Sequence, residues 1–219
     1  PHTVESFPRM ATFGEEIGCT PAMQFGALPH SFANRFASKL GISQDCTEIV
    51  HSQREVKSAW ELEMMADAAE VQADMFEAVY TVGGEGVTEI ELVAAVEAVS
   101  RAAGFGGNVQ MRRFPLQCDR GVIVAGRAGG IPSFFDSAIG GTGPHPMASM
   151  GSGFTKIKAN EPVLVDLVHV HRGYVVDTTR MFSAGSLPSL WQQRLEDMLA
   201  VKEKVVDVLD QGHNCTQAW

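Results

Sequence analysis

The sequence predicts an α+β fold, because helical and strand patterns both occur in long, well-bounded runs. Apolar residues recur at helical spacing over 58–82, 88–103 and 189–209. β-Branched and apolar residues dominate two runs within 163–183, and 108–114 and 120–126 are also predicted to be strands. A turn signal, Arg172-Gly173, separates the last two runs, which predicts a β-hairpin.

The composition is that of an acidic globular protein. The chain has 219 residues, a hydrophobic content of 45% and a formal net charge of −9, which suits one large domain or a domain with part of another. An acidic balance disfavours nucleic-acid binding, and no apolar run reaches the ~18 residues that a membrane span needs. The four scattered cysteines lack CxxC spacing, as expected of free thiols in a reducing compartment, so we expect a cytoplasmic protein.

The first 53 residues are expected to end one domain and lead into another. Phe32, Phe36 and Leu40 recur on one face of a short helix predicted over 31–40, and Gly41 ends it. The segment 46–52 is expected to be a short strand or an extended connector. The chain starts at Pro1 without a signal-peptide pattern and stops at Trp219 just after a helix, so we expect both ends to be cut.

Two helices are predicted between residues 58 and 103. Ser58 with Glu61, and Thr88 with Glu91, have the three-residue spacing of a capping box. Three glycines break the chain between the helices: Gly83, Gly84 and Gly86. The apolar stripe of the first helix is predicted to comprise Leu62, Met65, Ala69, Met75, Phe76 and Val79.

A long loop is predicted over 128–153, which is rich in Gly, Pro and Ser and has no periodicity. Loops of this length in compact domains are more often functional than idle. This one contains His145, flanked by Gly and Pro residues. A histidine here is either a site residue or an exposed loop residue without a role.

Two carboxylates lie on the predicted hairpin. Alternation places Asp166 on one face of the first strand, with Asp177 and Thr179 sharing a face of the second and His169 opposite Asp166. Neighbouring carboxylates repel unless a cation holds them or one has a raised pKa. The hairpin therefore raises the hypothesis of a metal site. The alternative is that Asp166 pairs with an arginine such as Arg180, or caps a backbone amide, and that Asp177 begins a turn.

These residues resemble the creatinase/aminopeptidase superfamily, in its Xaa-Pro aminopeptidase and prolidase branch. The match is Asp166, an eleven-residue step to Asp177, and the pattern G-Y-x-x-D-x-T-R-x-F over 173–182. Two weaker matches precede it: Arg54, Lys57, Ser58 and Glu61, and then Gly86, Thr88, Glu89 and Glu91. The resemblance implies the pita-bread fold, incomplete at the C-terminus. Residues 54–219 would be the N-terminal part of the catalytic domain, and 1–53 the C-terminal tail of a creatinase-like N-terminal domain.

The resemblance also implies a dinuclear metal centre built from two Asp, one His and two Glu. Asp166 would bind one ion and Asp177 would bridge both, so that a water is activated for attack on a peptide bond. Mn²⁺ is the expected ion, with Co²⁺, Fe²⁺ or Zn²⁺ as alternatives. His145, 21 residues before Asp166, has the order of the family histidine that contacts substrate.

The family's other His and two Glu normally follow the helix after the hairpin. The resemblance therefore implies a truncated chain, or a second chain that supplies those ligands, and a fragment that is inactive alone. Three functions stay open. The first is a homodimeric peptidase that cleaves the amino-terminal bond before proline in a peptide. The others are a metal-free creatinase-like hydrolase of small amidino substrates and a non-catalytic binding module.

Overall fold

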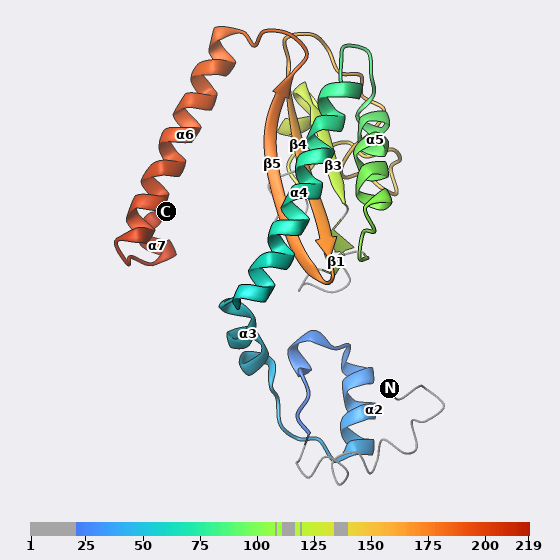
Figure 1. Ribbon diagram of the computed structural model, residues 1–219, viewed down its shortest axis with the longest axis vertical. Coiled ribbons are helices and arrows are strands. Elements are labelled where there is room, and N and C mark those ends of the chain that lie inside the picture. Colours follow the sequence, from blue (N-terminus) through green and yellow to red (C-terminus); the bar gives the residue numbers. More distant parts are fainter. Residues whose placement is uncertain (1–20, 108, 111–116, 119, 134–139) are drawn as a thin grey trace. The chain divides into compact units, whose positions relative to one another are not determined.

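The structure is a computed structural model that describes residues 21–107, 109–110, 117–118, 120–133 and 140–219 (Figure 1). The described residues divide into two compact units, one up to Leu62 and one from Glu63 onward. This division falls inside helix α4 (Ala59–Val82). The domain boundary after residue 53 remains a proposal.

The first unit contains η2 (Phe25–Ala27), α2 (His30–Leu40) and α3 (Thr47–Glu55). Helix α2 confirms the prediction, and Gly41 ends it in the left-handed region at φ 66°. The strand or extended connector expected over 46–52 is wrong, because that segment is helical. Asp45 Oδ1 accepts hydrogen bonds from the backbone N–H of Thr47 at 2.9 Å and from its hydroxyl at 2.6 Å. This bonding satisfies a donor at the helix start, and it outweighs the β-branched residues that suggested a strand.

The second unit is built on an antiparallel sheet in the order β3-β4-β5. The strands are β3 (Gly121–Ala125), β4 (Pro162–His171) and β5 (Tyr174–Ser183), and β4 and β5 form the predicted hairpin. A separate pair joins β1 (Val109–Gln110) to β2 (Gln117–Cys118). The rest of the strand predicted over 108–114 lies outside the described residues. Short 3-10 helix η3 (Gly126–Gly130) follows β3.

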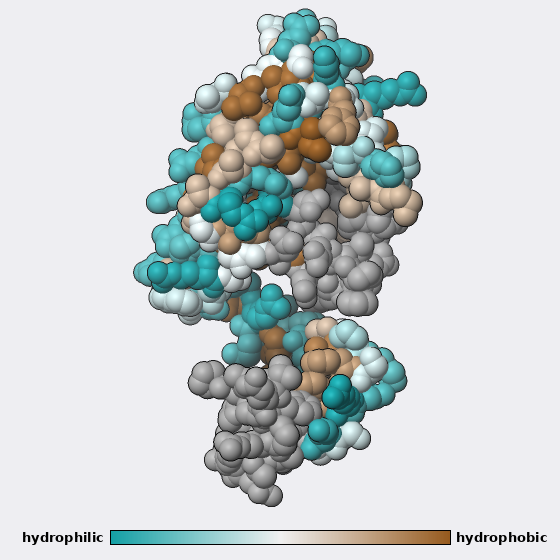
Figure 2. All heavy atoms as spheres, turned by 90° about the vertical axis from the view of Figure 1, so that its right-hand side faces the viewer, coloured by the Kyte–Doolittle hydropathy of each residue, from teal (hydrophilic) through white to brown (hydrophobic). Residues whose placement is uncertain are grey.

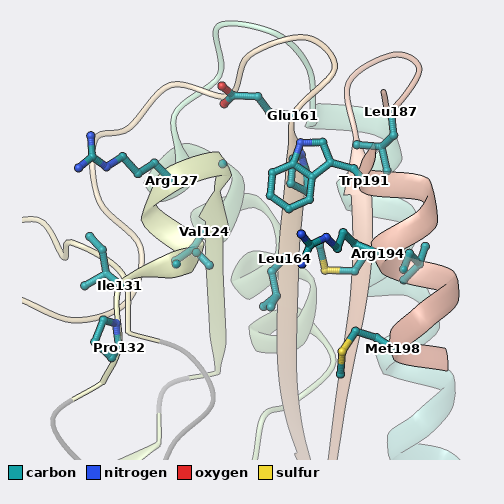
Figure 3. A pocket seen from close by; sticks show the side chains of 16 residues that line it. Val124, Arg127, Ile131, Pro132, Glu161, Leu164, Leu187, Trp191, Arg194 and Met198 are labelled. Atoms are coloured by element: carbon teal, nitrogen blue, oxygen red, sulfur yellow. The ribbon is translucent and has the colours of Figure 1, made fainter. Parts of the chain in front are cut away.

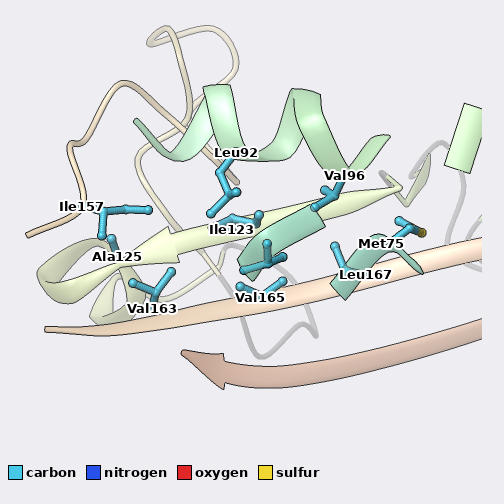
Figure 4. Packing of buried hydrophobic residues seen from close by; sticks show 10 residues of the cluster. Met75, Leu92, Val96, Ile123, Ala125, Ile157, Val163, Val165 and Leu167 are labelled. Atoms are coloured by element: carbon cyan, nitrogen blue, oxygen red, sulfur yellow. The ribbon is translucent and has the colours of Figure 1, made fainter. Parts of the chain in front are cut away.

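Helices α4 and α5 (Glu89–Ala102) begin with the two predicted capping boxes. The Thr88 N–H donates to Glu91 Oε2 at 2.9 Å, and the Ser58 N–H donates to Glu61 Oε2 at 2.6 Å. Both helices pack on one face of the sheet (Figure 4). Figure 2 shows hydrophilic and hydrophobic side chains interspersed on the side that carries α5, as expected of a helix with one buried face.

The predicted stripe of α4 is partly wrong. Met75 and Val79 are buried, but Leu62 and Ala69 are exposed, and the buried face continues through Met64, Ala68 and Gln72. Gln72 Nε2 donates to the carbonyls of Leu167 at 2.5 Å and Val176 at 2.8 Å. These bonds satisfy the buried amide, so a polar residue can occupy the face of α4 that packs on the core. A search for apolar periodicity cannot detect such a residue.

Between β3 and β4 the described chain is a long loop, as predicted, apart from η3 and isolated β-bridges. The loop folds closely on itself where Gly141 forms a bridge with Gly151. Gly141 has a φ of 80°, and a Cβ there would collide with the Gly151 carbonyl. Only glycine therefore fits at this position.

The chain closes with α6 (Ser189–Asp210), predicted over 189–209, and the short α7 (Cys215–Ala218). No residue of α6 is buried, and its exposed apolar residues include Leu190, Trp191, Leu195, Met198, Leu199, Val201, Val206 and Leu209. Among the described helices, none is both long and apolar enough to cross a membrane.

Candidate metal centre

The register of the hairpin brings the two aspartates to one face. Asp166 lies opposite Thr179, and Val168 lies opposite Asp177. Asp166 and Asp177 are therefore diagonal neighbours across β4 and β5, on the face turned away from α4 and α5. The predicted alternation of faces is confirmed, whereas the role of these residues in metal binding remains a prediction.

The electrostatics of the pair are those of two carboxylates held close together. Loss of surrounding water, the charge of Asp166 and a hydrogen bond between the two carboxyls raise the pKa of Asp177 from 3.8 to about 6. Thr179 donates its hydroxyl to Asp166 Oδ1 at 2.6 Å. Thr179 thereby holds one oxygen of the Asp166 carboxyl group in place.

The geometry does not support an arginine partner for Asp166 or a turn that begins at Asp177. Arg180 lies on the opposite face of β5, where its guanidinium donates to the Thr179 carbonyl at 2.8 Å. In the described part of the chain, neither aspartate forms an ion pair. Asp177 lies in the middle of β5 and does not begin a turn.

The carboxylates of Asp166 and Asp177 are donors that suit a hard divalent ion. Carboxylate oxygens are the ligands that Mn²⁺ and Mg²⁺ prefer, and a cation would relieve the repulsion that raises the Asp177 pKa. Within the described ranges, no three His, Cys, Asp or Glu side chains gather into a metal-binding group. The described residues thus bring together two candidate ligands.

His145 lies in the long loop and is exposed. Its Nδ1 accepts a hydrogen bond from the Met147 N–H at 3.1 Å. No hydrogen bond or ion pair among the described residues joins it to either aspartate. His169, expected to be packed, is fully buried on the other face, with its Nδ1 2.8 Å from the Ser100 hydroxyl.

Thr179 is the residue whose contact the sequence interpretation missed, although a signal for it was present. A hairpin that turns at Arg172-Gly173 has a set register, and that register places residue 179 opposite residue 166. A hydroxyl beside a carboxylate could therefore have been predicted. Glu89 also belongs to a family motif matched in the sequence, but neither a role for it nor the burial of its carboxylate was predicted.

A cavity of about 880 Å³ lies on the same face of the sheet as the aspartates, neither of which lines it. Val124, Leu164 and Met181 line it from the three strands, and Leu164 directly precedes Asp166 on that face. Trp191, Arg194 and Met198 project from α6 toward the sheet (Figure 3), and Arg127 of η3 also lines the cavity. The lining is largely apolar, and the sequence interpretation did not foresee it.

Comparison with solved structures defines the class of fold. An X-Pro aminopeptidase from Thermotoga maritima superposes with a TM-score of 0.71 at 17% identity, over 95% of this chain and 53% of that one. A prolidase from Pyrococcus horikoshii gives 0.66 at 20% identity, over 90% and 50%. An Xaa-Pro dipeptidase from Bacillus anthracis gives 0.69 at 17%, over 94% and 51%. The fold is therefore the pita-bread fold of these peptidases, and the chain spans about half the length of the structures it matches.

The sequence specifies the family. Residues 63–219 match the model of Metallopeptidase family M24, so this chain belongs to that family of metal-dependent peptidases. A search of the curated proteins found no match. The resemblance inferred from the hairpin motif is confirmed at the level of fold and family.

Proposed function

We propose that the protein carrying this chain is an M24 peptidase that hydrolyses the amino-terminal peptide bond before proline. Asp166 and Asp177 would be ligands of a centre of two divalent ions. The observation that best supports this proposal is the pairing of these carboxylates on one open face of the sheet, with the pKa of Asp177 raised to about 6. Mn²⁺ as the ion, a homodimer and a cytoplasmic location belong to the same proposal.

The chain's own residues have distinct parts in this proposal. When bound, the divalent ions would supply Lewis-acid activation of water and of the peptide carbonyl. Thr179 holds one oxygen of Asp166 through its hydroxyl, which orients that carboxylate. Asp177 gives up its proton on binding, so binding strengthens as the pH rises through about 6.

His145 is the proposed substrate-contacting residue. Because its Nδ1 accepts a backbone N–H, the neutral ring carries its hydrogen on Nε2. An exposed Nε2–H is a donor suited to negative charge that develops on a substrate carbonyl oxygen. The position of His145 in the long loop between β3 and β4 supports this role.

The proposal is tested by titrating Mn²⁺ into the chain by calorimetry. We expect Asp166→Asn and Asp177→Asn each to weaken binding by at least about tenfold, because each removes a charged ligand. Asp67→Asn is the control. This acid also lies in the second unit, on α4 beside His171 at 3.6 Å and apart from the pair, and its variant should bind Mn²⁺ as the wild type does.

Equal Mn²⁺ binding in wild type and both aspartate variants would contradict the proposal. Cleavage of Xaa-Pro peptides by the complete protein, lost in Asp177→Asn, tests the activity itself. Hydrolysis of amidino substrates without added metal would instead favour the creatinase-like alternative. Metal-independent ligand binding without hydrolysis would favour a binding module.

A further inference from the structure

Glu89 is a fully buried carboxylate that the proposed chemistry does not use. It is the first residue of α5, and its side chain is wholly inaccessible. Oε1 accepts the Ala125 N–H at 2.7 Å, and Oε2 accepts the Gly153 N–H at 2.8 Å. Ala125 ends β3 and Gly153 lies within the loop between β3 and β4, so one carboxylate holds both ends of the segment 126–152.

The backbone of the first turn of α5 strengthens the same junction. The Ile90 N–H donates to the Gly153 carbonyl at 3.1 Å, and the Glu89 N–H donates to the Thr155 carbonyl at 3.0 Å. Gly153 is therefore bonded to α5 through both its N–H and its carbonyl. Burial raises the pKa of Glu89 while the two backbone donors lower it, and the helix N-terminus is a favourable place for a negative charge.

The segment between these ends carries the features that matter for the site. It contains His145, and its residues Arg127, Ile131 and Pro132 line the cavity on the face of the sheet that carries the aspartates. Further along, the Gly151 N–H donates to the Gly140 carbonyl at 2.6 Å and the Gly143 N–H to the Gly151 carbonyl at 3.0 Å. These bonds tie the part that holds His145 to residue 151, which lies next to the Glu89 contact.

We infer that Glu89 is a positioning residue whose carboxylate clasps the base of the loop 126–152. The clasp sets the placement of His145 and of the loop wall of the cavity against the sheet. The hydrogen bonds of Glu89 by themselves support the fixing of the two loop ends. The consequence for catalysis rests on the proposed function.

The test compares Glu89→Gln with Glu91→Gln by amide hydrogen exchange. A Gln at 89 keeps one acceptor but turns an NH₂ donor toward the second N–H, which leaves that contact unmade. Glu91 is a matched control, because it loses the same charge in the same helical turn, whereas among the described residues its carboxylate bonds only Thr88, at 2.9 and 2.7 Å. Glu89→Gln should make the Ala125 and Gly153 amides exchange roughly ten- to a hundredfold faster. Glu91→Gln should leave their exchange unchanged.

The amides of β4 separate a clasp from a general contribution to stability. Local opening leaves the exchange of Val165 and Leu167 unchanged, whereas a global loss of stability accelerates every slow amide alike. Equal acceleration throughout, or none at Gly153, would overturn the inference. If Glu89→Gln fails to fold, hydrogen exchange of the wild-type protein still tests the inference, because an unprotected Gly153 amide is incompatible with the clasp.

Activity of the complete protein tests the catalytic consequence. If the inference and the proposed function both hold, Glu89→Gln lowers kcat for Xaa-Pro cleavage while Mn²⁺ binding is retained. Faster loop exchange with an unchanged kcat would uphold the clasp and overturn the assignment of His145 to catalysis. Loss of Mn²⁺ binding in the variant would contradict a role confined to the loop.

Discussion

Thr178 and Thr179 are neighbours on β5 whose hydroxyls serve opposite faces of the sheet. Thr178 donates to Gln72 Oε1 at 2.7 Å on the covered face, and Thr179 donates to Asp166 Oδ1 at 2.6 Å on the open face. The two residues have the same side chain and adjacent positions. Variants of these two residues can therefore distinguish a role in stabilising the core from a role in the candidate metal centre.

We expect Thr179→Val to weaken Mn²⁺ binding by roughly tenfold, because the group that orients Asp166 is lost. The free energy of unfolding of the Thr179→Val variant should change by less than about 1 kcal/mol, since the hydrogen bond from Thr179 to Asp166 is exposed. Thr178→Val should instead lower that free energy by about 1–3 kcal/mol, because it removes a partner of buried Gln72. Calorimetric Mn²⁺ titration and urea unfolding of both variants provide the check, and similar Mn²⁺ affinities in the two would contradict the assignment.

At the scale of elements, α5 contacts β4 through a buried polar pair as well as through apolar side chains. Ser100 of α5 lies 2.8 Å from His169 of β4, and Phe105 packs edge-on against the imidazole with ring centroids 6.0 Å apart. Burial, and secondarily the charge of His171, lower the pKa of His169 below its ordinary 6.5. The packing of α5 on the sheet therefore requires a neutral imidazole.

The neutral imidazole predicts that His169 contributes less stability in acid. Below pH 6.5 the unfolded chain binds a proton at residue 169 before the folded chain does, so the contribution of His169 to the free energy of unfolding falls as the pH falls. The raised pKa of Asp177 acts in the opposite direction. His169→Gln, which can still bond Ser100, should remove the contribution of His169 between pH 7.5 and pH 5. His171→Gln, two residues along the same strand, should keep most of it. Urea unfolding across this pH range measures the slopes, and an unchanged slope in His169→Gln would refute the explanation.

At the scale of the whole molecule, the two faces of the sheet are treated unequally. One face is buried under α4 and α5, whereas on the other face the cavity separates the strands from α6. Trp191 is 46% exposed and Met198 is 62% exposed, beside the open apolar lining. An exposed, contiguous apolar patch on a monomer marks a surface for association.

We therefore expect the 219-residue chain to self-associate and to bind the dye ANS. The double variant Trp191→Ser with Met198→Ser should reduce both, because it removes the largest apolar groups that α6 directs at the cavity. Leu62→Ser, at a position 56% exposed on α4, is the control and should change neither. Sedimentation velocity and dye fluorescence are the measurements, and a dye-free monomeric wild type would show that this surface is not adhesive.

Local chemistry could be predicted from the sequence wherever a few neighbouring residues suffice. The capping boxes at Ser58 and Thr88, the turn at Arg172-Gly173 and the shared face of the two aspartates all follow from short-range spacing. The family assignment also followed, because its motif lies within the single hairpin. These features depend on backbone geometry that neighbouring residues determine by themselves.

Only the tertiary structure decided which polar groups are buried and what they hold. Gln72 lies in the core because two strand carbonyls meet it, and Glu89 is buried because two backbone donors distant in sequence converge on it. Burial of a polar group is favourable only when its partners are in place. Those partners lie 36 to 104 residues away along the chain. No local pattern encodes such distant contacts, so the buried face of α4 and the clasp of the loop became visible only in the folded chain.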